Sequence, residues 1–198
     1  PNAAHEPIIK IENLYKKYGD NVVLDGFNLN LYQGENLVIM GKSGSGKSVM
    51  IKCLIGLEIP DSGTIEIMSQ KLEHLSLKAL DEIRADIGFL FQGSALYDSM
   101  TVRENLEFPL RRHISKFGNV KDTLPLVEEA LENVGLKNVI DLMPNELSGG
   151  MKRRVALART LILKPKIIIY DEPTTGLDPI TSKEIILLMK SVQEKYKT

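Results

Sequence analysis

The 198-residue sequence contains a single cysteine, so it cannot form an internal disulfide bond, and this composition suits a reducing compartment. It has no apolar run that approaches the roughly 18 residues a helix needs to cross a bilayer. The formal net charge of −1 gives no overall field that would attract nucleic acid or an acidic membrane. The three histidines show no spacing typical of metal ligands. At 43% hydrophobic residues, the chain can still bury a sizeable core in one domain.

The glycine-rich stretch Gly41–Ser48 fits the pattern G-x-x-x-x-G-K-[ST] at every fixed position. The apolar segment Glu35–Met40 before it predicts a buried strand, and Val49–Gly56 after it predicts a helix. Glycines let successive backbone amides turn toward one anion, and the start of a helix adds partial positive charge. We therefore predict a phosphate-binding loop in which Lys47 reaches the β- and γ-phosphates and the Ser48 hydroxyl ligates Mg²⁺.

A second apolar segment, Ile167–Tyr170, predicts a buried strand that ends in two acids, Asp171 and Glu172. Carboxylates at the carboxyl end of a parallel strand lie where α/β folds bind ligands. We expect Asp171 to hold Mg²⁺ and Glu172 to accept a proton from an attacking water. The alternative is a strand end with solvated acids, which the phosphate loop in the same chain disfavours.

The stretch Leu147–Met151 opens a further predicted helix. Ser148 is a good N-cap residue, and Gly149 and Gly150 leave the first backbone amides bare. An ordinary capped helix would explain the serine alone. A second anion site is harder to explain within one chain, because one nucleotide rarely needs two phosphate cradles. Two chains that face each other head to tail would use both.

The remaining pattern predicts an α/β fold whose strand-and-helix core is interrupted by a helical insert of about 60 residues. The insert covers residues 101–163, with helix breaks expected at Pro109, Gly118, Gly135 and Pro144. Further strands are expected at 8–14 (an edge strand), 22–32, 64–68 and 87–91, and further helices at 77–84 and 179–196.

Five motifs in this order resemble the nucleotide-binding domain of ABC ATPases, and the resemblance extends over nearly the whole chain: Gly41–Ser48, Gln92, Leu147–Met151, Ile167–Glu172 and Gly176–Pro179. The resemblance implies one domain, residues 1–198, with a P-loop NTPase (RecA-like) core, an N-terminal antiparallel β subdomain and an inserted helical subdomain. Residues 1–92 and 164–198 would form the core and the β subdomain. Residues 93–163 would form the helical subdomain that carries the signature.

The same resemblance implies roles for single residues. Tyr18 would stack on the adenine of ATP, a role that its flat ring suits. Gln92 would contact the Mg²⁺ shell and a membrane partner, so the metal set is Ser48, Gln92 and Asp171 and the catalytic set is Lys47, Gln92 and Glu172. The implied ATP-binding residues are Tyr18, Gly41, Ser43, Gly44, Ser45, Gly46, Lys47, Ser48 and Val49.

The family's dimer is implied by two further motifs. Ser148, Gly149 and Gly150 would bind the γ-phosphate of ATP held by the opposite subunit of a homodimer, and Asp178 would lie at the dimer seam. The usual signature ends in Gln where this chain has Met151, which we interpret as a variant and not as a loss.

A finer resemblance, to the Mla-type (Mce-associated) ATPases that drive lipid transport across bacterial envelopes, rests on Phe91–Asn105, Phe108–Arg111 and Leu142–Met151. It implies an integral membrane permease as partner and a peripheral location on the cytoplasmic face of the inner membrane. The permease would dock on residues 93–110, which would otherwise expose Ala95, Leu96, Tyr97 and Met100 for no reason.

Two other functions remain open from the sequence. A soluble ABC ATPase acting on DNA or the ribosome is one, but the basic clusters Arg111–Arg112 and Lys152–Arg154 are better interpreted as solvated helix faces, so we expect no nucleic acid. A nucleotide-dependent switch or assembly module without efficient turnover is the other. Family members continue for roughly 40–60 residues past Thr198 and carry a histidine that contacts the γ-phosphate, and none follows Asp178 here. We therefore expect a C-terminally truncated domain that binds ATP and hydrolyses it weakly.

Overall fold

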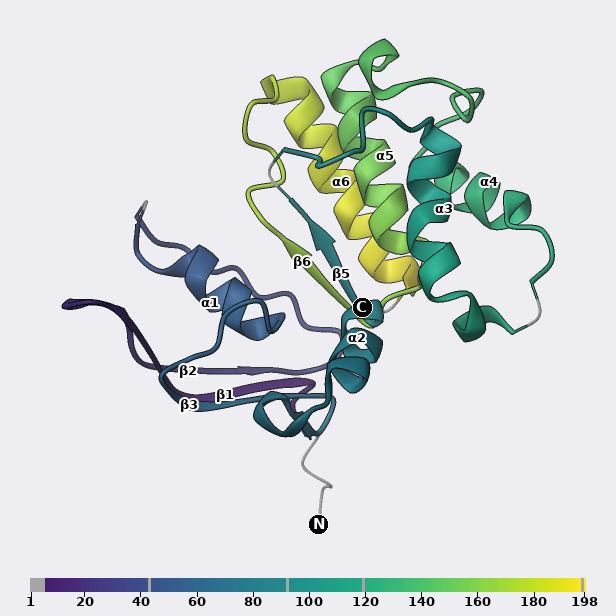
Figure 1. Ribbon diagram of the computed structural model, residues 1–198. Helices are drawn as coiled ribbons and strands as arrows, with labels where there is room; N and C mark the ends of the chain where they lie inside the picture. Colours follow the sequence, from purple (N-terminus) through teal and green to yellow (C-terminus); the bar gives the residue numbers. More distant parts are fainter. Residues whose placement is uncertain (1–5, 43, 92, 119, 197) are drawn as a thin grey trace. The chain divides into compact units, whose positions relative to one another are not determined.

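The computed structural model describes residues 6–42, 44–91, 93–118, 120–196 and 198 of the chain (Figure 1). The chain divides into two compact units, Pro1–Arg84 and Ala85–Thr198, which we call the first and the second unit. Each unit has its own sheet and its own buried apolar residues.

The first unit contains an antiparallel sheet of four strands in the order β2-β1-β3-β4. The strands are β1 (Ile9–Tyr18), β2 (Asn21–Leu31), β3 (Ser62–Ile67) and β4 (Gln70–Lys71). β1 pairs on both sides, so the sequence prediction of an edge strand at 8–14 is wrong, whereas the antiparallel β subdomain is confirmed. A sequence pattern shows which residues alternate and not which strands lie on either side.

β1 contains an irregularity that preserves its buried face. Ile9, Ile11 and Leu14 are all buried, although strict alternation would place Leu14 on the other face. The pairing register shifts between Ile11 and Leu14, and Asn13 there has a φ of 50°. The extra residue of such a bulge changes the face of the residues that follow, so Leu14 returns to the core.

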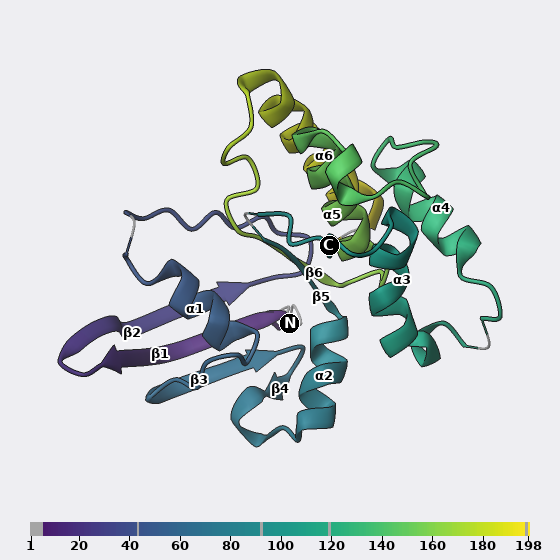
Figure 2. The ribbon, with the colours of Figure 1, turned by 45° about the horizontal axis from the view of Figure 1, so that its top comes forward.

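One face of this sheet is covered by a helix (Figure 2). Helix α1 (Lys47–Leu54) places Met50, Cys53 and Leu54 in the core, and the single cysteine of the chain, Cys53, is only 1% exposed. A short 3₁₀ turn, η1 (Leu72–His74), and helix α2 (Leu77–Ala85) complete this part of the chain. Arg84 of α2 donates to the carbonyls of Ile55 and Gly56, which fixes the end of α1 against α2.

The predicted strand at Glu35–Met40 is absent, and this is the largest error in the sequence prediction. Residues 35–42 are irregular, and the side chains of Val38 and Met40 are 73% and 87% exposed. Apolar composition favours burial but supplies no hydrogen-bond partner, and a strand requires a neighbouring strand. No strand in the described part of the chain pairs with this segment.

The second unit is built on two parallel strands, β5 (Ile87–Leu90) and β6 (Ile167–Tyr170), paired in register from Ile87 with Ile167 to Leu90 with Tyr170. The long connection between them contains α3 (Val102–Arg112), η2 (Ile114–Phe117), α4 (Leu124–Asn133), η3 (Pro144–Glu146) and α5 (Gly149–Leu161). Helix α6 (Pro179–Tyr196) follows β6 and lies beside α5 in both views (Figures 1 and 2).

Helix α5 crosses β5 at close range. The Thr160 hydroxyl donates to the Phe89 carbonyl over 3.2 Å, and a Cβ on Gly88 would lie 2.6 Å from the Thr160 methyl group. Only glycine therefore fits at position 88. The buried core of this unit gathers around α5, with Val102 and Leu106 of α3 and Val127 and Leu131 of α4.

Helix α3 runs through Pro109, so the helix break predicted there is wrong. Proline removes one backbone donor but does not prevent a helix that is stabilised elsewhere. The start of α3 is a complete capping box, because Thr101 accepts from the Glu104 amide and the Glu104 carboxylate accepts from the Thr101 amide. Burial of Leu106 and Leu110 on either side of the proline adds the packing.

Candidate nucleotide-binding and signature sites

The phosphate loop has the backbone that its glycines predict. Gly44 and Gly46 have φ angles of 79° and 89°, in the left-handed region that glycine adopts at least cost. A Cβ on Gly46 would lie 2.7 Å from the Val23 carbonyl oxygen, so the loop can approach β2 only with glycine at that position. Ser43, which the sequence analysis placed in the same loop, lies outside the described residues.

Lys47 is held by the loop that it follows. Its Nζ donates to the carbonyls of Gly41 over 2.6 Å and Lys42 over 3.0 Å, and the Ser45 amide also donates to the Lys42 carbonyl. A Cβ on Gly41 would lie 2.4 Å from the Ser45 hydroxyl oxygen, which shows how tightly the loop closes. The ammonium group and the backbone of one short loop therefore lie together, as phosphate binding requires.

The residues that begin α1 are suited to Mg²⁺ and phosphate. Ser48 is exposed and Val49 is half-buried in the first turn of the helix. Mg²⁺ in phosphate sites takes only one or two protein oxygens and completes its shell with water and phosphate oxygens. Two side chains offer oxygen ligands of this kind. They are the Ser48 hydroxyl, which belongs to the first unit, and the Asp171 carboxylate, which belongs to the second unit.

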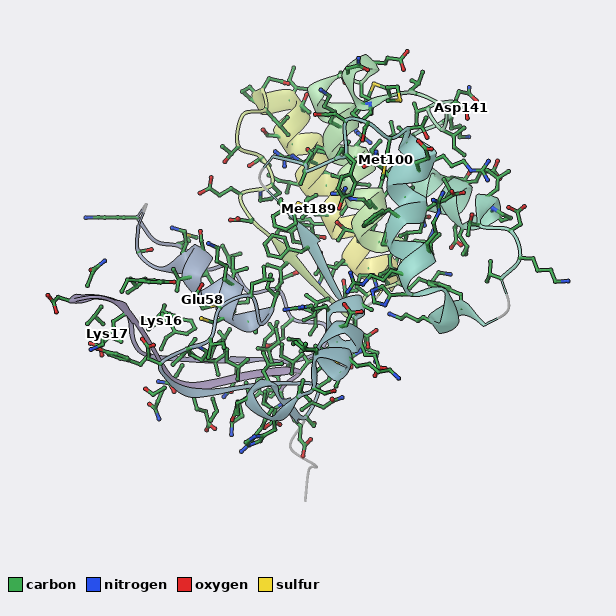
Figure 3. The ribbon with its side chains drawn as sticks, viewed as in Figure 1. Lys16, Lys17, Glu58, Met100, Asp141 and Met189 are labelled. Carbon is green, nitrogen blue, oxygen red and sulfur yellow. The ribbon has the colours of Figure 1, made fainter. Side chains whose placement is uncertain are left out.

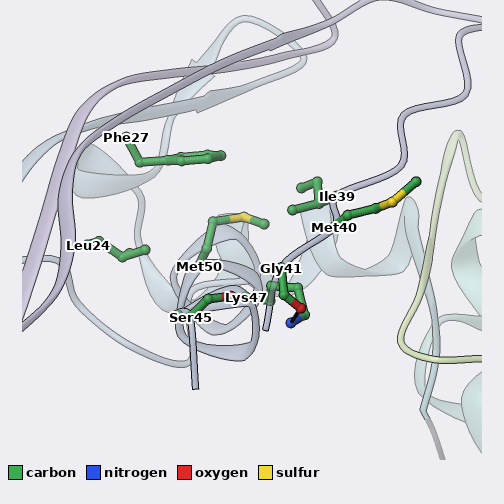
Figure 4. Close-up of a pocket in the computed structure, with 9 residues that line it drawn as sticks. Leu24, Phe27, Ile39, Met40, Gly41, Ser45, Lys47 and Met50 are labelled. Carbon is green, nitrogen blue, oxygen red and sulfur yellow. Dashed lines mark hydrogen bonds between the residues drawn. The ribbon is translucent and has the colours of Figure 1, made fainter. Parts of the chain in front are cut away.

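A pocket of about 210 Å³ opens beside the phosphate loop within the first unit (Figure 4). One side is apolar and the other is formed by the loop. Leu24 and Phe27 come from β2, and Met50 comes from α1. The other lining residues are Ile39, Met40, Gly41, Ser45, Gly46 and Lys47.

Tyr18, the predicted adenine-stacking residue, ends β1 and is 46% exposed, so one face of its ring is accessible. Desolvation and then a hydrogen bond with Glu58 raise the pKa of its hydroxyl. The Lys16 ammonium lies 5.4 Å from the ring centre and also pairs with Glu58 over 3.4 Å (Figure 3). These contacts orient the ring at the surface of the first unit.

Asp171 and Glu172 lie directly after β6 in the second unit. The Asp171 amide donates to the Leu90 carbonyl, which continues the β5–β6 pairing by one residue. Glu172 has a φ of 44°, an uncommon value for a residue with a side chain. Thr175 holds it there, because its amide donates to the Glu172 carbonyl over 3.2 Å and its hydroxyl to Glu172 Oε2 over 3.1 Å.

The signature helix begins as predicted. Ser148 precedes α5, and its hydroxyl accepts from the Met151 amide over 3.2 Å. A Cβ on Gly150 would lie 3.0 Å from the Thr181 methyl group, so this signature glycine adjoins the first turn of α6, which Asp178 precedes. The structure thus brings two of the predicted motifs together within the second unit.

Asp178 caps helix α6. Its Oδ1 accepts from the amides of Ile180 and Thr181, each over 3.0 Å. Hydrogen bonds with Thr181, from its side chain and its backbone, lower the pKa of the Asp178 carboxyl. A structural role at a helix start therefore accompanies the role at a dimer seam that the resemblance implies.

Gln92 lies outside the described residues, but the segment that follows it is well organised. The Asn105 side chain is buried, accepts from the Tyr97 amide and donates to the carbonyls of Tyr97, Met100 and Thr101. Arg159 donates to the Ser94 carbonyl over 3.1 Å and lies over the Tyr97 ring.

These contacts leave part of the predicted docking face open. Ala95 is exposed and Tyr97 is 44% exposed, whereas Leu96 and Met100 are half-buried. The sequence prediction that all four would be exposed therefore needs correction. Leu96 packs against the helical core instead.

Arg153 is the residue that sequence reasoning missed. The sequence analysis placed it on a solvated helix face, but it is only 4% exposed and donates to the carbonyls of Phe91 and Thr175. A signal was available, because residues 153, 157 and 161 lie on one face of a helix and the last two are leucines.

Within the described ranges, no helix has the length and apolar character needed to cross a membrane. Over the same residues, no three histidine, cysteine, aspartate or glutamate side chains come together as a metal-binding group.

Comparison with known proteins defines the class. A sequence model of the ABC transporter family matches residues 24–175. The chain is 40% identical over 190 residues to the intermembrane phospholipid transport system ATP-binding protein MlaF of Haemophilus influenzae, covering 96% of this chain and 71% of that protein. It is 38% identical over 192 residues to the methionine import ATP-binding protein MetN of Clostridium tetani, covering 96% of this chain and 59% of MetN.

A solved structure is similar as well. It is described as a dimeric, post-hydrolysis state of the ATP-binding cassette MJ0796 bound to ADP and Pi, and it matches with a TM-score of 0.81 at 37% identity, over 94% of this chain and 83% of that one. The chain therefore belongs to the ABC transporter family, as an ATP-binding domain with the α/β fold of P-loop NTPases.

Proposed function

We propose that this chain is the ATP-hydrolysing part of a transporter that moves phospholipid across the bacterial envelope. The observation that carries the ATPase part of the proposal is the presence, in one chain, of two glycine-containing helix starts of the kind that bind anions. One is the loop of Lys47 and the other is the α5 start at Ser148. A homodimer of two such chains would enclose two ATP molecules, each between the Lys47 loop of one chain and the Ser148 helix of the other.

In this proposal the reaction is hydrolysis of Mg-ATP. Lys47 would neutralise charge on the β- and γ-phosphates, and Ser48, Asp171 and Gln92 would hold Mg²⁺, which would neutralise charge that develops on the phosphate oxygens. Glu172 accepts the proton of the attacking water, which is general base catalysis. The dimer described for MJ0796, which is similar to this chain, supports the assembly. The weak turnover expected from the sequence stays a prediction.

The proposed partner is an integral membrane permease that docks on residues 93–110. Two features of this segment support docking there. Its backbone is ordered by side-chain hydrogen bonds. Its aromatic residues Tyr97 and Phe108 are each nearly half exposed, with ring centres 5.0 Å apart. The chain would then act as a peripheral subunit on the cytoplasmic face of the inner membrane. Phospholipid as cargo is favoured by the similarity to MlaF.

Methionine import is a second candidate, because MetN is nearly as similar as MlaF. The natural full-length protein, purified together with its membrane partners, separates the two. Phosphate release should be stimulated by phospholipid vesicles and not by methionine, and lipid should co-purify with the complex. Stimulation by methionine alone would replace the lipid proposal, and a complex that releases no phosphate under any condition would contradict the ATPase itself.

A further inference from the structure

Arg153 is a buried charge without a charged partner. It is 4% exposed, and within the described residues no carboxylate pairs with it. Nη1 donates to the Phe91 carbonyl over 2.8 Å, Nη2 donates to the Thr175 carbonyl over 3.3 Å, and the buried Nε has no hydrogen-bond partner.

Stability does not explain this arrangement. Burying a guanidinium costs hydration free energy, and two carbonyls return only part of it. A methionine would fill a similar volume on α5 without that cost. Glu107 shows the contrast within the same unit, because Arg103, Arg111 and Thr123 all donate to its buried carboxylate.

The two carbonyls belong to segments that follow β5 and β6. These parallel strands are paired in register, so the segments leave the sheet at the same end. Phe91 directly precedes residue 92, and its carbonyl also accepts from the Ser94 amide over 3.1 Å. Arg153 therefore connects two segments of the chain. One leads from β5 to the docking segment, residues 93–110, and the other follows Glu172.

The contact with Thr175 reaches Glu172 itself. Thr175 is held at its carbonyl by Arg153, while its own amide and hydroxyl hold the carbonyl and carboxylate of Glu172. Two hydrogen bonds, with Thr175 between them, thus connect the guanidinium with the carboxylate, and the Thr175 amide adds a third to the Glu172 backbone carbonyl. Glu172, the last residue reached by these hydrogen bonds, is the residue with the uncommon φ of 44°.

We propose that Arg153 is a positioning residue for ATP hydrolysis, which fixes the Glu172 carboxylate relative to the signature helix α5. This inference rests on the proposed function. Ser148 opens the helix that carries Arg153, so the proposed base of one site is tied to the helix that would meet the ATP of the other subunit. Arg153 acts through Thr175 and touches no reacting atom.

The test compares Arg153→Met with Arg154→Met in the natural full-length protein. Arg154 is the next residue of α5 and donates to the Val134 carbonyl and to Glu184, not to either segment that Arg153 joins. Arg153→Met should lower kcat about 10- to 100-fold with less than about a three-fold change in KM, because misplacing a base affects the chemical step. Arg154→Met should leave kcat near that of the wild type. Equal kcat values for the two variants would overturn the proposal.

A second pair of variants decides the matter even if Arg153→Met fails to fold. Thr175→Val removes the hydroxyl that holds Glu172 and keeps the backbone carbonyl, and Thr175→Ser keeps both. Thr175→Val should lower kcat by a similar factor. In the double variant Thr175→Val with Arg153→Lys, the fold-loss of kcat should be smaller than the product of the fold-losses of the two single variants. Full activity of Thr175→Val, or losses that multiply in the double variant, would contradict the inference.

Hydrogen exchange distinguishes positioning from general destabilisation. Arg153→Met should speed amide exchange in residues 171–178 at an unchanged melting temperature, and a matching rise throughout the chain would indicate a structural role only. An inactive wild-type protein would contradict the proposed function together with this inference. An active wild type with an unaffected Arg153→Met variant would contradict this inference alone.

Discussion

We expect nucleotide binding to depend most on Lys47. Its ammonium lies against the carbonyls of Gly41 and Lys42, beside the amides that would face a phosphate. Lys47→Ala should weaken ATP binding about 10- to 100-fold, because a charged hydrogen bond contributes about 1.5–3 kcal/mol. Titration of a fluorescent ATP analogue measures the loss. Lys52→Ala, on the exposed face of the same helix, is the matched control, and equal affinities in the two variants would refute the assignment.

At this scale the sequence identifies residues whose role depends on their neighbours in the chain. The loop from Gly41 to Ser48 and the cap at Ser148 are local patterns, and both are found in the structure. Arg153 could not be assigned in this way, because Phe91 and Thr175 lie far from it in the sequence. Helical spacing indicates that Arg153 is buried, but it does not indicate which groups accept its hydrogen bonds.

Secondary structure elements show the same distinction. Helix α6 was predicted at residues 179–196 and lies at Pro179–Tyr196, since helix hydrogen bonds form within the segment itself. The strand predicted at 35–40 is absent, since a strand depends on a partner that the segment does not contain. Pro109 was predicted to break a helix that its capping box and buried leucines maintain.

Helix α3 carries a pH-dependent contribution to stability at Glu107. Burial raises the pKa of this carboxyl, but hydrogen bonds from Arg103, Arg111 and Thr123 outweigh it and lower the pKa from 4.5 to about 2. Because the folded-state pKa lies below the unfolded one, the contribution is fully present above pH about 4.5 and is lost as the pH falls toward about 2.

Glu107→Gln should therefore destabilise the protein by about 2 kcal/mol near pH 6, and the difference from the wild type should shrink as the pH falls below about 4. Urea unfolding across this pH range measures it. Glu128→Gln on the exposed face of α4 is the control and should show no such trend. A constant difference between wild type and Glu107→Gln at all pH values would contradict the ion-pair account.

On the scale of the whole molecule, the docking face can be tested at Ala95. This residue is exposed at a φ of 47°, a backbone conformation that Asp tolerates better than Ala, so Ala95→Asp should fold normally. An unpaired charge in the contact should weaken assembly with the permease at least about ten-fold while ATP binding survives.

Asn138→Asp is the matched control for Ala95→Asp. It is also exposed, has a φ of 58° and gains the same charge, but it lies outside residues 93–110. Co-purification of the permease with each variant gives the comparison. Normal recovery of the complex with Ala95→Asp would show that the permease binds elsewhere.

The proposed dimer concerns the largest scale and depends on Glu172. The exposed carboxylate, held by the Thr175 hydroxyl, is the proposed base, and Glu172→Gln keeps its shape and its hydrogen bond while removing its basicity. ATP should then bind without being hydrolysed, so a full-length Glu172→Gln protein should remain dimeric in saturating Mg-ATP. Light scattering with and without ATP measures the mass.

Ser148→Ala in the Glu172→Gln protein tests the same arrangement from the signature helix. It removes the cap of α5 and one donor to the opposite ATP, so it should shift the dimer toward monomer. A Glu172→Gln protein that stays monomeric with bound ATP would refute the two-chain arrangement, because both anion sites would then have to work within one chain.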